Sequence, residues 1–149
     1  MITVYKMEYK HISDDKSNIE MVRYSSEYRE KFKSIYNECY HKMRKALGIQ
    51  PYDFIQDDSF FESNMDNVYL LLDKEVIIGS VTLKGDEIDD LIVNSKYQGK
   101  GFGRKILLWA LEHIKTEKII LHVAAWNEQA INLYKNTGFE IIETITINN

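Results

Sequence analysis

Gln98-Gly99-Lys100-Gly101-Phe102-Gly103 stands between a short apolar run at residues 91–93 and a helical pattern at residues 104–115. Its three glycines occupy alternate positions, so side chains do not shield the main chain where the helix begins. Exposed N–H groups and the positive end of a helix dipole together form a binding site for phosphate groups. The stretch therefore predicts a strand, a loop and a helix that hold a phosphorylated ligand.

The spacing within this loop excludes two common nucleotide-binding motifs. A Walker loop has Ser or Thr after its Gly-Lys pair to hold magnesium, but Gly101 follows Lys100 here. The dinucleotide fingerprint Gly-x-Gly-x-x-Gly, read from Gly99 or Gly101, needs glycine at Arg104 or Ile106. The remaining description is Gln-x-x-Gly-x-Gly between a strand and a helix.

A second motif follows after one helix and one strand. It has the pattern Asn-x-x-Ala-x-x-Leu-Tyr-x-x-x-Gly-Phe and consists of Asn127, Ala130, Leu133, Tyr134, Gly138 and Phe139. The two motifs together resemble the GNAT superfamily of acyl-CoA-dependent N-acetyltransferases, in which the first motif forms the pyrophosphate loop. The resemblance runs from Glu87 to the end of the chain. It departs from many members at Ser95, where they have proline.

The composition of the 149 residues is typical of one folded domain. Apolar residues make up 44% and charged residues 28%, so we expect a single domain, 1–149, with residues 1–18 as an extra strand or extension. The net charge of −4 argues against nucleic-acid binding, which needs a basic surface. The apolar stretches are too short to span a bilayer, and Cys39 is the single cysteine. These features predict a cytoplasmic protein without membrane contact.

Hydrophobic periodicity predicts alternating strands and helices. The expected strands are Ile2–Tyr9 as an additional edge strand, 19–24, 68–72, 76–83, Glu87–Val93, 119–125 and Phe139–Ile147. The expected helices are one capped by Ser25 or Ser26 and ended by Gly48, a short one at 58–63, one at 104–115, and Glu128–Thr137. This order predicts an α/β fold with helices on both faces of one sheet.

The resemblance adds detail to this fold. It implies a single GNAT-like domain whose central sheet is mixed but mostly antiparallel. It also implies a V-shaped splay between the strand that ends at Val93 and the strand that ends near Ala125. The cofactor would enter the gap between these two strands.

The resemblance further implies acetyl-CoA as the cosubstrate. Its pyrophosphate would bind the main chain of the loop, formed by Gln98, Gly99, Lys100, Gly101, Phe102, Gly103 and Arg104. Its pantetheine arm would bind the main chain of Leu91, Ile92 and Val93, together with Asn127 and Tyr134. Two alternatives stay open, because the glycines also suit a tight turn and Asn127 also suits a helix N-cap.

The chemistry requires a base, because only a neutral amine attacks a thioester. Glu87 stands where histone-type members of the family carry their base, and Asp89 is the second candidate. Strand alternation places Asp89 on the same face as Glu87, and Asp90 on the opposite face. Tyr134 matches the family tyrosine that protonates the departing thiolate. An exposed acidic strand edge and a core tyrosine are the structural alternatives.

The resulting hypothesis is an N-acetyltransferase that moves acetyl from acetyl-CoA to a primary amine by direct attack in a ternary complex. The sequence shows no metal-ligand spacing and no nucleophile pattern. Acidic residues at Asp53, Asp57, Asp58 and Glu62 favour a cationic acceptor. The alternative is a non-catalytic acyl-CoA-binding regulatory module, and an ATP-binding protein is a more distant one. The acceptor and the choice between monomer and homodimer stay open.

Overall fold

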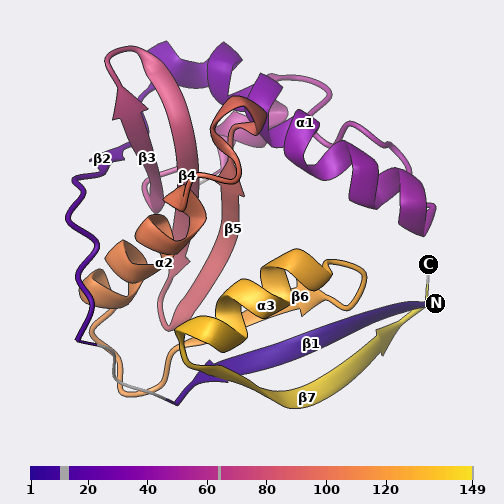
Figure 1. Cartoon of the computed structure of the whole chain (residues 1–149). Helices are drawn as coiled ribbons and strands as arrows, with labels where there is room; N and C mark the ends of the chain where they lie inside the picture. The colour runs from indigo at the N-terminus through magenta and orange to yellow at the C-terminus, as the bar shows by residue number, and fades with distance from the viewer. Residues whose placement is uncertain (11–13, 64, 149) are drawn as a thin grey trace.

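The apolar run before the glycine loop lies in the middle of a mixed sheet in the computed structural model, which describes residues 1–10, 14–63 and 65–148 (Figure 1). Within these residues, seven strands follow the order β2-β3-β4-β5-β6-β1-β7. They are β1 (Ile2–Tyr9), β2 (Val22–Arg23), β3 (Val68–Asp73), β4 (Val76–Lys84), β5 (Glu87–Val93), β6 (Ile120–Ala124) and β7 (Phe139–Ile147). All neighbours are antiparallel apart from β5 and β6. The predicted α/β fold with a mostly antiparallel sheet is confirmed.

Helices cover both faces of the sheet. They are α1 (Arg29–Leu47), α2 (Phe102–His113) and α3 (Glu128–Thr137), with short 3-10 turns η1 (Ser26–Tyr28), η2 (Asp58–Glu62) and η3 (Ser95–Tyr97). In β4, Ile77 packs in a core with Phe32 of α1, whereas Ile78 packs in a core with Ile106 of α2. Successive side chains of a strand point to opposite faces, so α1 covers one face and α2 the other (Figure 1). No helix in the described residues is long and apolar enough to cross a membrane.

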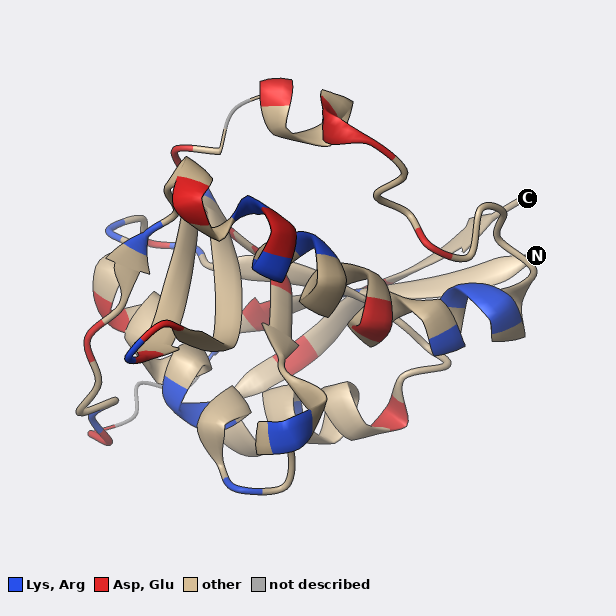
Figure 2. Ribbon diagram, turned by 90° about the horizontal axis from the view of Figure 1, so that it is seen from above, with Lys and Arg blue, Asp and Glu red and all other residues tan. Residues whose placement is uncertain are grey.

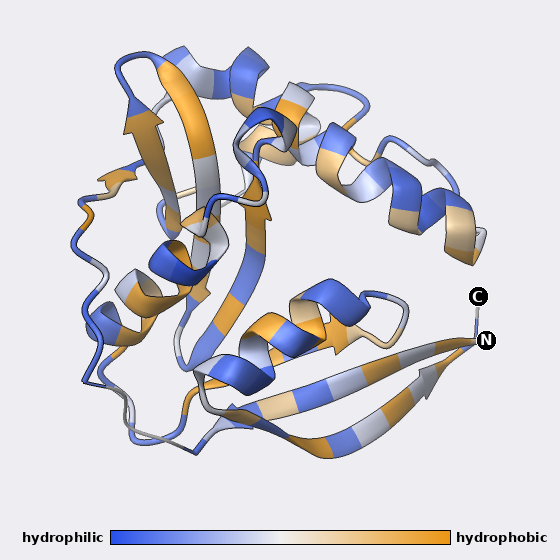
Figure 3. Cartoon of the chain, viewed as in Figure 1, coloured by the Kyte–Doolittle hydropathy of each residue, from blue (hydrophilic) through white to orange (hydrophobic). Residues whose placement is uncertain are grey.

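Hydropathy explains how deeply each strand is buried (Figure 3). Strand β4 has no charged residue before Lys84 at its end, and its residues 77–82 are buried, as expected for a strand covered on both faces. Strand β1 mixes apolar and polar residues, and β7 is largely exposed. The sheet therefore has its best-covered strand near the glycine loop and an exposed edge at β7.

Strands β5 and β6 separate after a short parallel contact. In the described chain, their register consists of Glu87 with Ile120 and Ile88 with Leu121. Beyond this contact β5 continues beside β4, and β6 continues beside β1. The two halves of the sheet diverge in Figure 1. The predicted V-shaped splay is confirmed.

The prediction that Ile2–Tyr9 forms an edge strand is wrong. Strand β1 lies between β6 and β7, where Met7 pairs with Leu121 on one side and with Ile141 on the other. Both partners come from the C-terminal part of the chain, so no local pattern indicates this position. Residues 11–13, which belong to the predicted extension, lie outside the described ranges.

Two other element bounds differ from the prediction. The strand expected at 19–24 is limited to Val22–Arg23 at the exposed end of the sheet. Helix α2 begins at Phe102, two residues before the expected start, because Gly101 is its N-cap. The last glycine of the loop therefore lies inside the first turn of the helix.

Candidate active site

The glycine loop leaves main-chain N–H groups exposed between β5 and α2. Gly99 and Gly101 have φ angles of 77° and 85°, in the left-handed region that favours glycine. No side chain caps the start of α2, and the Lys105 N–H donates to the Gly101 oxygen at 3.2 Å. The N–H groups of the three helical residues before Lys105 therefore have no acceptor within the helix. These groups are available to an anion.

Asn94 anchors the start of this loop. Its Oδ1 accepts a hydrogen bond from the Lys96 N–H at 3.1 Å, and its Nδ2 donates to the Ile77 oxygen at 3.0 Å. The loop is therefore tied to β4 even though Ser95 replaces the proline of many GNAT proteins.

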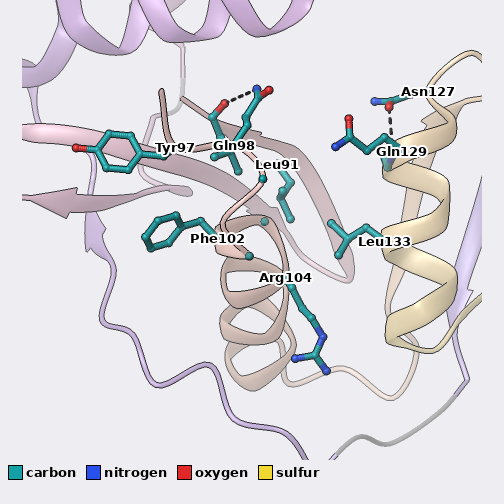
Figure 4. Close-up of a pocket in the computed structure, with 13 residues that line it drawn as sticks. Leu91, Tyr97, Gln98, Phe102, Arg104, Asn127, Gln129 and Leu133 are labelled. Atoms are coloured by element: carbon teal, nitrogen blue, oxygen red, sulfur yellow. Dashed lines mark hydrogen bonds between the residues drawn. The ribbon is translucent and has the colours of Figure 1, made fainter. Parts of the chain in front are cut away.

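A cavity of about 310 Å³ lies beside the loop, between the first turns of α2 and α3 (Figure 4). Nine predicted cofactor-binding residues line it: Leu91, Val93, Gln98, Gly99, Gly101, Phe102, Gly103, Arg104 and Asn127. Tyr97, Gln129, Ala130 and Leu133 complete the lining. The Gln98 side chain donates to the Val93 oxygen at 3.0 Å, and Asn127 Oδ1 accepts from the Ala130 N–H at 3.2 Å. These two bonds, drawn in Figure 4, fix opposite walls of the cavity.

The three other predicted cofactor-binding residues do not line this cavity. Ile92 is 4% exposed and packs in the core beneath α1, although its main chain belongs to β5. The Lys100 Nζ lies 5.7 Å from the centre of the Tyr97 ring. Tyr134 lines a second cavity instead.

The second cavity, of about 530 Å³, lies between the C-terminal half of α1 and strands β1 and β6. Leu91, Asn127 and Ala130 line both cavities. The two cavities therefore meet where β5 and β6 diverge, so a molecule in each would approach the other at these shared residues.

Asp90 lies in this second cavity, and its predicted orientation is wrong. Strand alternation places Asp90 opposite Asp89, but both residues line the same cavity. The cause is an irregularity in β5, where Asp90 has a φ of 45° and the register with β4 shifts. Asp90 Oδ1 accepts hydrogen bonds from Tyr40 at 2.9 Å and Tyr36 at 3.3 Å. Burial raises the pKa of the Asp90 carboxyl, and the charge of Asp89 raises it further.

The two predicted base candidates have different surroundings. The Glu87 carboxylate lies 3.0 Å from Nδ1 of His122, and it is His122 that lines the second cavity. Asp89 lines the cavity directly and accepts a hydrogen bond from Lys84 at 2.9 Å. Sequence reasoning missed His122, although a histidine between the buried residues Leu121 and Val123 signals a strand position on the opposite face.

Tyr134 faces the second cavity from α3. Its side chain is 8% exposed, and burial raises its pKa to about 12, with a further contribution from the charge of Asp89. The phenol therefore keeps its proton at neutral pH.

Arg104 is engaged by a carboxylate from the N-terminal segment. Its Nη2 forms an ion pair with Asp15, and both side chains are about half exposed. Arg104 also lines the first cavity, so the pair lies at the edge of the candidate phosphate site.

Comparison with known proteins agrees with this arrangement. The model of the Acetyltransferase (GNAT) family matches residues 19–139. The chain belongs to the GNAT acetyltransferase family. This GNAT protein therefore has the domain of a family of acetyltransferases.

Curated relatives of this GNAT protein match only in part. It is 36% identical over 66 residues to the spermidine N(1)-acetyltransferase of Vibrio cholerae, covering 39% of this chain and 38% of that protein. It is 35% identical over 57 residues to the spermine/spermidine N(1)-acetyltransferase of Bacillus subtilis, covering 36% and 38%. The chain therefore spans well under half the length of these relatives.

Solved structures share the fold of this GNAT protein. A GNAT-family acetyltransferase from Colwellia psychrerythraea superposes with a TM-score of 0.74 at 13% identity, over 95% of this chain and 53% of that one. The PaiA N-acetyltransferase from Thermoplasma acidophilum, in complex with coenzyme A, superposes with a TM-score of 0.67 at 17% identity, over 83% and 90%. At these identities the likeness establishes the GNAT fold.

Proposed function

We propose that this GNAT protein transfers the acetyl group of acetyl-CoA to a primary amine by direct attack in a ternary complex. The observation that carries the proposal is the meeting of the two cavities at Leu91, Asn127 and Ala130. One cavity has the exposed N–H groups of a helix start, and the other has carboxylates and a buried phenol. The relatives named as spermidine acetyltransferases act on amines, which supports an amine acceptor.

The first cavity is the proposed binding site for the pyrophosphate end of coenzyme A. The N–H groups at the start of α2 would hold the pyrophosphate, because left-handed glycines keep the loop main chain clear of side chains. The β5 main chain at Leu91, Ile92 and Val93 would hold the pantetheine arm, and Lys100 and Arg104 would add positive charge. Bound acetyl-CoA supplies an acetyl thioester that is activated toward amines. The coenzyme A complex of the Thermoplasma relative supports this assignment.

The Asp15 pair predicts an effect on cofactor affinity. Replacing Asp15 with asparagine is expected to tighten coenzyme A binding by about two- to fivefold, because an exposed ion pair contributes up to about 1 kcal/mol. The Arg104 guanidinium would then interact with the phosphates without competition from the Asp15 carboxylate. Titration calorimetry at low salt measures the change, and the gain should disappear in an Arg104→Ala background. Weaker binding by Asp15→Asn would contradict this role of the pair.

Two groups at the second cavity are placed to take the amine proton. His122 lines the cavity, and its Nδ1 lies beside the Glu87 carboxylate. The imidazole would therefore receive the proton, while the carboxylate orients the imidazole ring. Asp89 is the second proton acceptor. Tyr134 would donate its phenolic proton to the departing sulfur. The base first takes one proton from the ammonium group. The neutral nitrogen then gains the acetyl group as the carbon–sulfur bond breaks, one proton passes from Tyr134 to the thiolate, and the second proton lost by the nitrogen restores the phenol.

Cys39 supports direct attack over a covalent acyl-enzyme. Its thiol donates a hydrogen bond to the Val93 oxygen at 3.3 Å, and burial raises its pKa to about 11. A thiol with such a pKa is mostly protonated at neutral pH, and the thiolate is the nucleophilic form. Cys39 is therefore poorly suited to carry the acetyl group.

Paired substitutions test the proton acceptor. Replacing His122 with asparagine or Glu87 with glutamine is expected to lower kcat by about 10- to 30-fold, with the Kd for coenzyme A unchanged. The double variant should lose no more than the worse single variant, because the two residues act as a unit. Release of free thiol from acetyl-CoA with a panel of primary amines gives the rate.

The surface pair His41 and Asp53 provides a matched control for this test. Its atoms lie 2.8 Å apart and neither residue lines the second cavity, so His41→Asn should leave kcat unchanged. Coenzyme A binding without thiol release for any amine would contradict the proposed enzyme and support an acyl-CoA-binding regulatory module.

A further inference from the structure

The second cavity is polar at its inner end and apolar over most of its wall. Eleven of its seventeen lining residues are apolar: Ile2, Val4, Met43, Leu47, Ile49, Ile88, Leu91, Val123, Ala124, Ala130 and Ile147. The polar residues gather around Asp89, Asp90 and Tyr134, close to the residues shared with the first cavity. An occupant must therefore combine one polar group with a larger apolar part.

The apolar wall extends outward along α1. Tyr40, Met43 and Leu47 follow at three- and four-residue spacing and all line the cavity. Seven residues of helix span about 10 Å. The apolar wall therefore extends about 10 Å from Tyr40, whose hydroxyl donates a hydrogen bond to Asp90. The opposite wall is completed by the pair of Ile2 and Ile147 at the ends of β1 and β7. This wall is long enough for a short alkyl chain or one aromatic ring.

Charge is distributed unevenly along the same cavity. Both carboxylates among its described lining residues, Asp89 and Asp90, belong to the inner end. At the outer end, the last turn of α1 carries Lys45 beside Leu47 (Figure 2), whereas Arg44 lines a neighbouring cavity with Asp90. An ammonium group is attracted to the inner end, whereas a second ammonium group at the outer end would meet apolar walls and positive charge.

The inner end also contains a phenol that faces the cavity. The Tyr134 side chain is 8% exposed and lines the cavity, so its hydroxyl can form a hydrogen bond with a ligand there.

Resting on the amine acetylation proposed above, we propose that the acceptor is a primary monoamine with an alkyl or arylalkyl group. Its ammonium group binds at Asp90 beside Tyr134, and its apolar group lies between α1 and β1. This acceptor differs from the polyamines named for the curated relatives. Ile2, Val4 and Ile147, which form part of the apolar wall, lie outside the residues that match the family model.

A thiol-release assay with propylamine, hexylamine, phenethylamine, spermidine and a peptide with a free N-terminus tests this acceptor class. We expect kcat/KM to rise about fourfold per methylene from propylamine to hexylamine. We also expect hexylamine to exceed spermidine by on the order of 100-fold. Preference for spermidine or for the peptide would overturn the acceptor class while leaving amine acetylation intact. No thiol release with any amine would instead refute the proposed function.

Two variants in the last turn of α1 separate the cavity wall from general charge effects. Leu47→Asp places a carboxylate at the outer end and should raise the ratio of kcat/KM for spermidine over hexylamine by about tenfold or more. Ala46→Asp adds the same charge one residue away on the exposed face and should leave the ratio unchanged. Equal ratios for the two variants would overturn the proposal. Melting curves of both variants establish that each is folded.

A third variant tests the anchor at the inner end. Asp90→Asn keeps an acceptor for the tyrosine hydroxyls but removes the charge that attracts the ammonium group. It should raise KM for hexylamine by about tenfold or more, with a smaller change in kcat and an unchanged Kd for coenzyme A. An unchanged KM would remove Asp90 from the binding site.

Discussion

Replacing Gly101 with valine is expected to weaken coenzyme A binding by more than about 100-fold, a loss of about 2.7 kcal/mol. Gly101 has a φ of 85°, and a side-chain residue in this region costs roughly 1–2 kcal/mol. A Cβ at this position meets no atom within 4 Å, so the valine would extend into the open space beside the loop. Strain and obstruction would both act on the N–H groups at the start of α2. Titration calorimetry gives the change in Kd.

Gly85 supplies a matched control for this substitution. It has a φ of 63°, a Cβ there also meets no atom within 4 Å, and it lies in the hairpin between β4 and β5, outside the first cavity. Gly85→Val should therefore lower the melting temperature by a similar amount without changing coenzyme A binding. Equal losses of affinity in the two variants would show that the effect is one of stability.

Replacing Tyr134 with phenylalanine is expected to lower kcat by about 100-fold or more, because a positioned general acid contributes roughly 10²- to 10⁴-fold. The Kd for coenzyme A should change little, since the hydroxyl faces the second cavity. The pKa of about 12 keeps the phenol protonated on the alkaline side of neutrality. In the wild-type enzyme, loss of the Tyr134 proton should therefore cause no fall in kcat below about pH 10.

Tyr5→Phe is the matched control for this variant. Tyr5 packs against the same core but lines neither of the two cavities, so removing its hydroxyl should leave kcat unchanged. Single-turnover measurements with the fastest amine separate the chemical step from product release. A Tyr134→Phe enzyme with wild-type single-turnover rates would exclude the general-acid role.

The first cavity could be predicted from the sequence, because the residues that shape it lie in two short motifs. The glycine positions specify the left-handed turns, and Asn127 caps α3 within its own motif. Nine of the twelve predicted cofactor-binding residues line one cavity, so contiguous sequence describes this cavity well.

The second cavity is harder to predict from the sequence, because its geometry depends on pairing between strands that are distant in the chain. A local distortion of β5 turns Asp90 toward the tyrosines of α1, and simple alternation predicts the reverse. The placement of β1 depends on strands near the other end of the chain. Glu87 can be proposed from a family position, but its contact with His122 follows only from the parallel register of β5 and β6.

The position of β1 has a consequence for protein synthesis. This strand leaves the ribosome early, yet both of its neighbours, β6 and β7, are translated near the end. Pairings with such large sequence separation form slowly, and an unpaired strand is prone to aggregate. The hairpins of β3, β4 and β5 need no such delay. We therefore expect the strands β3, β4 and β5 of the nascent chain to pair first, and the chain to require protection by chaperones until β6 and β7 pair with β1.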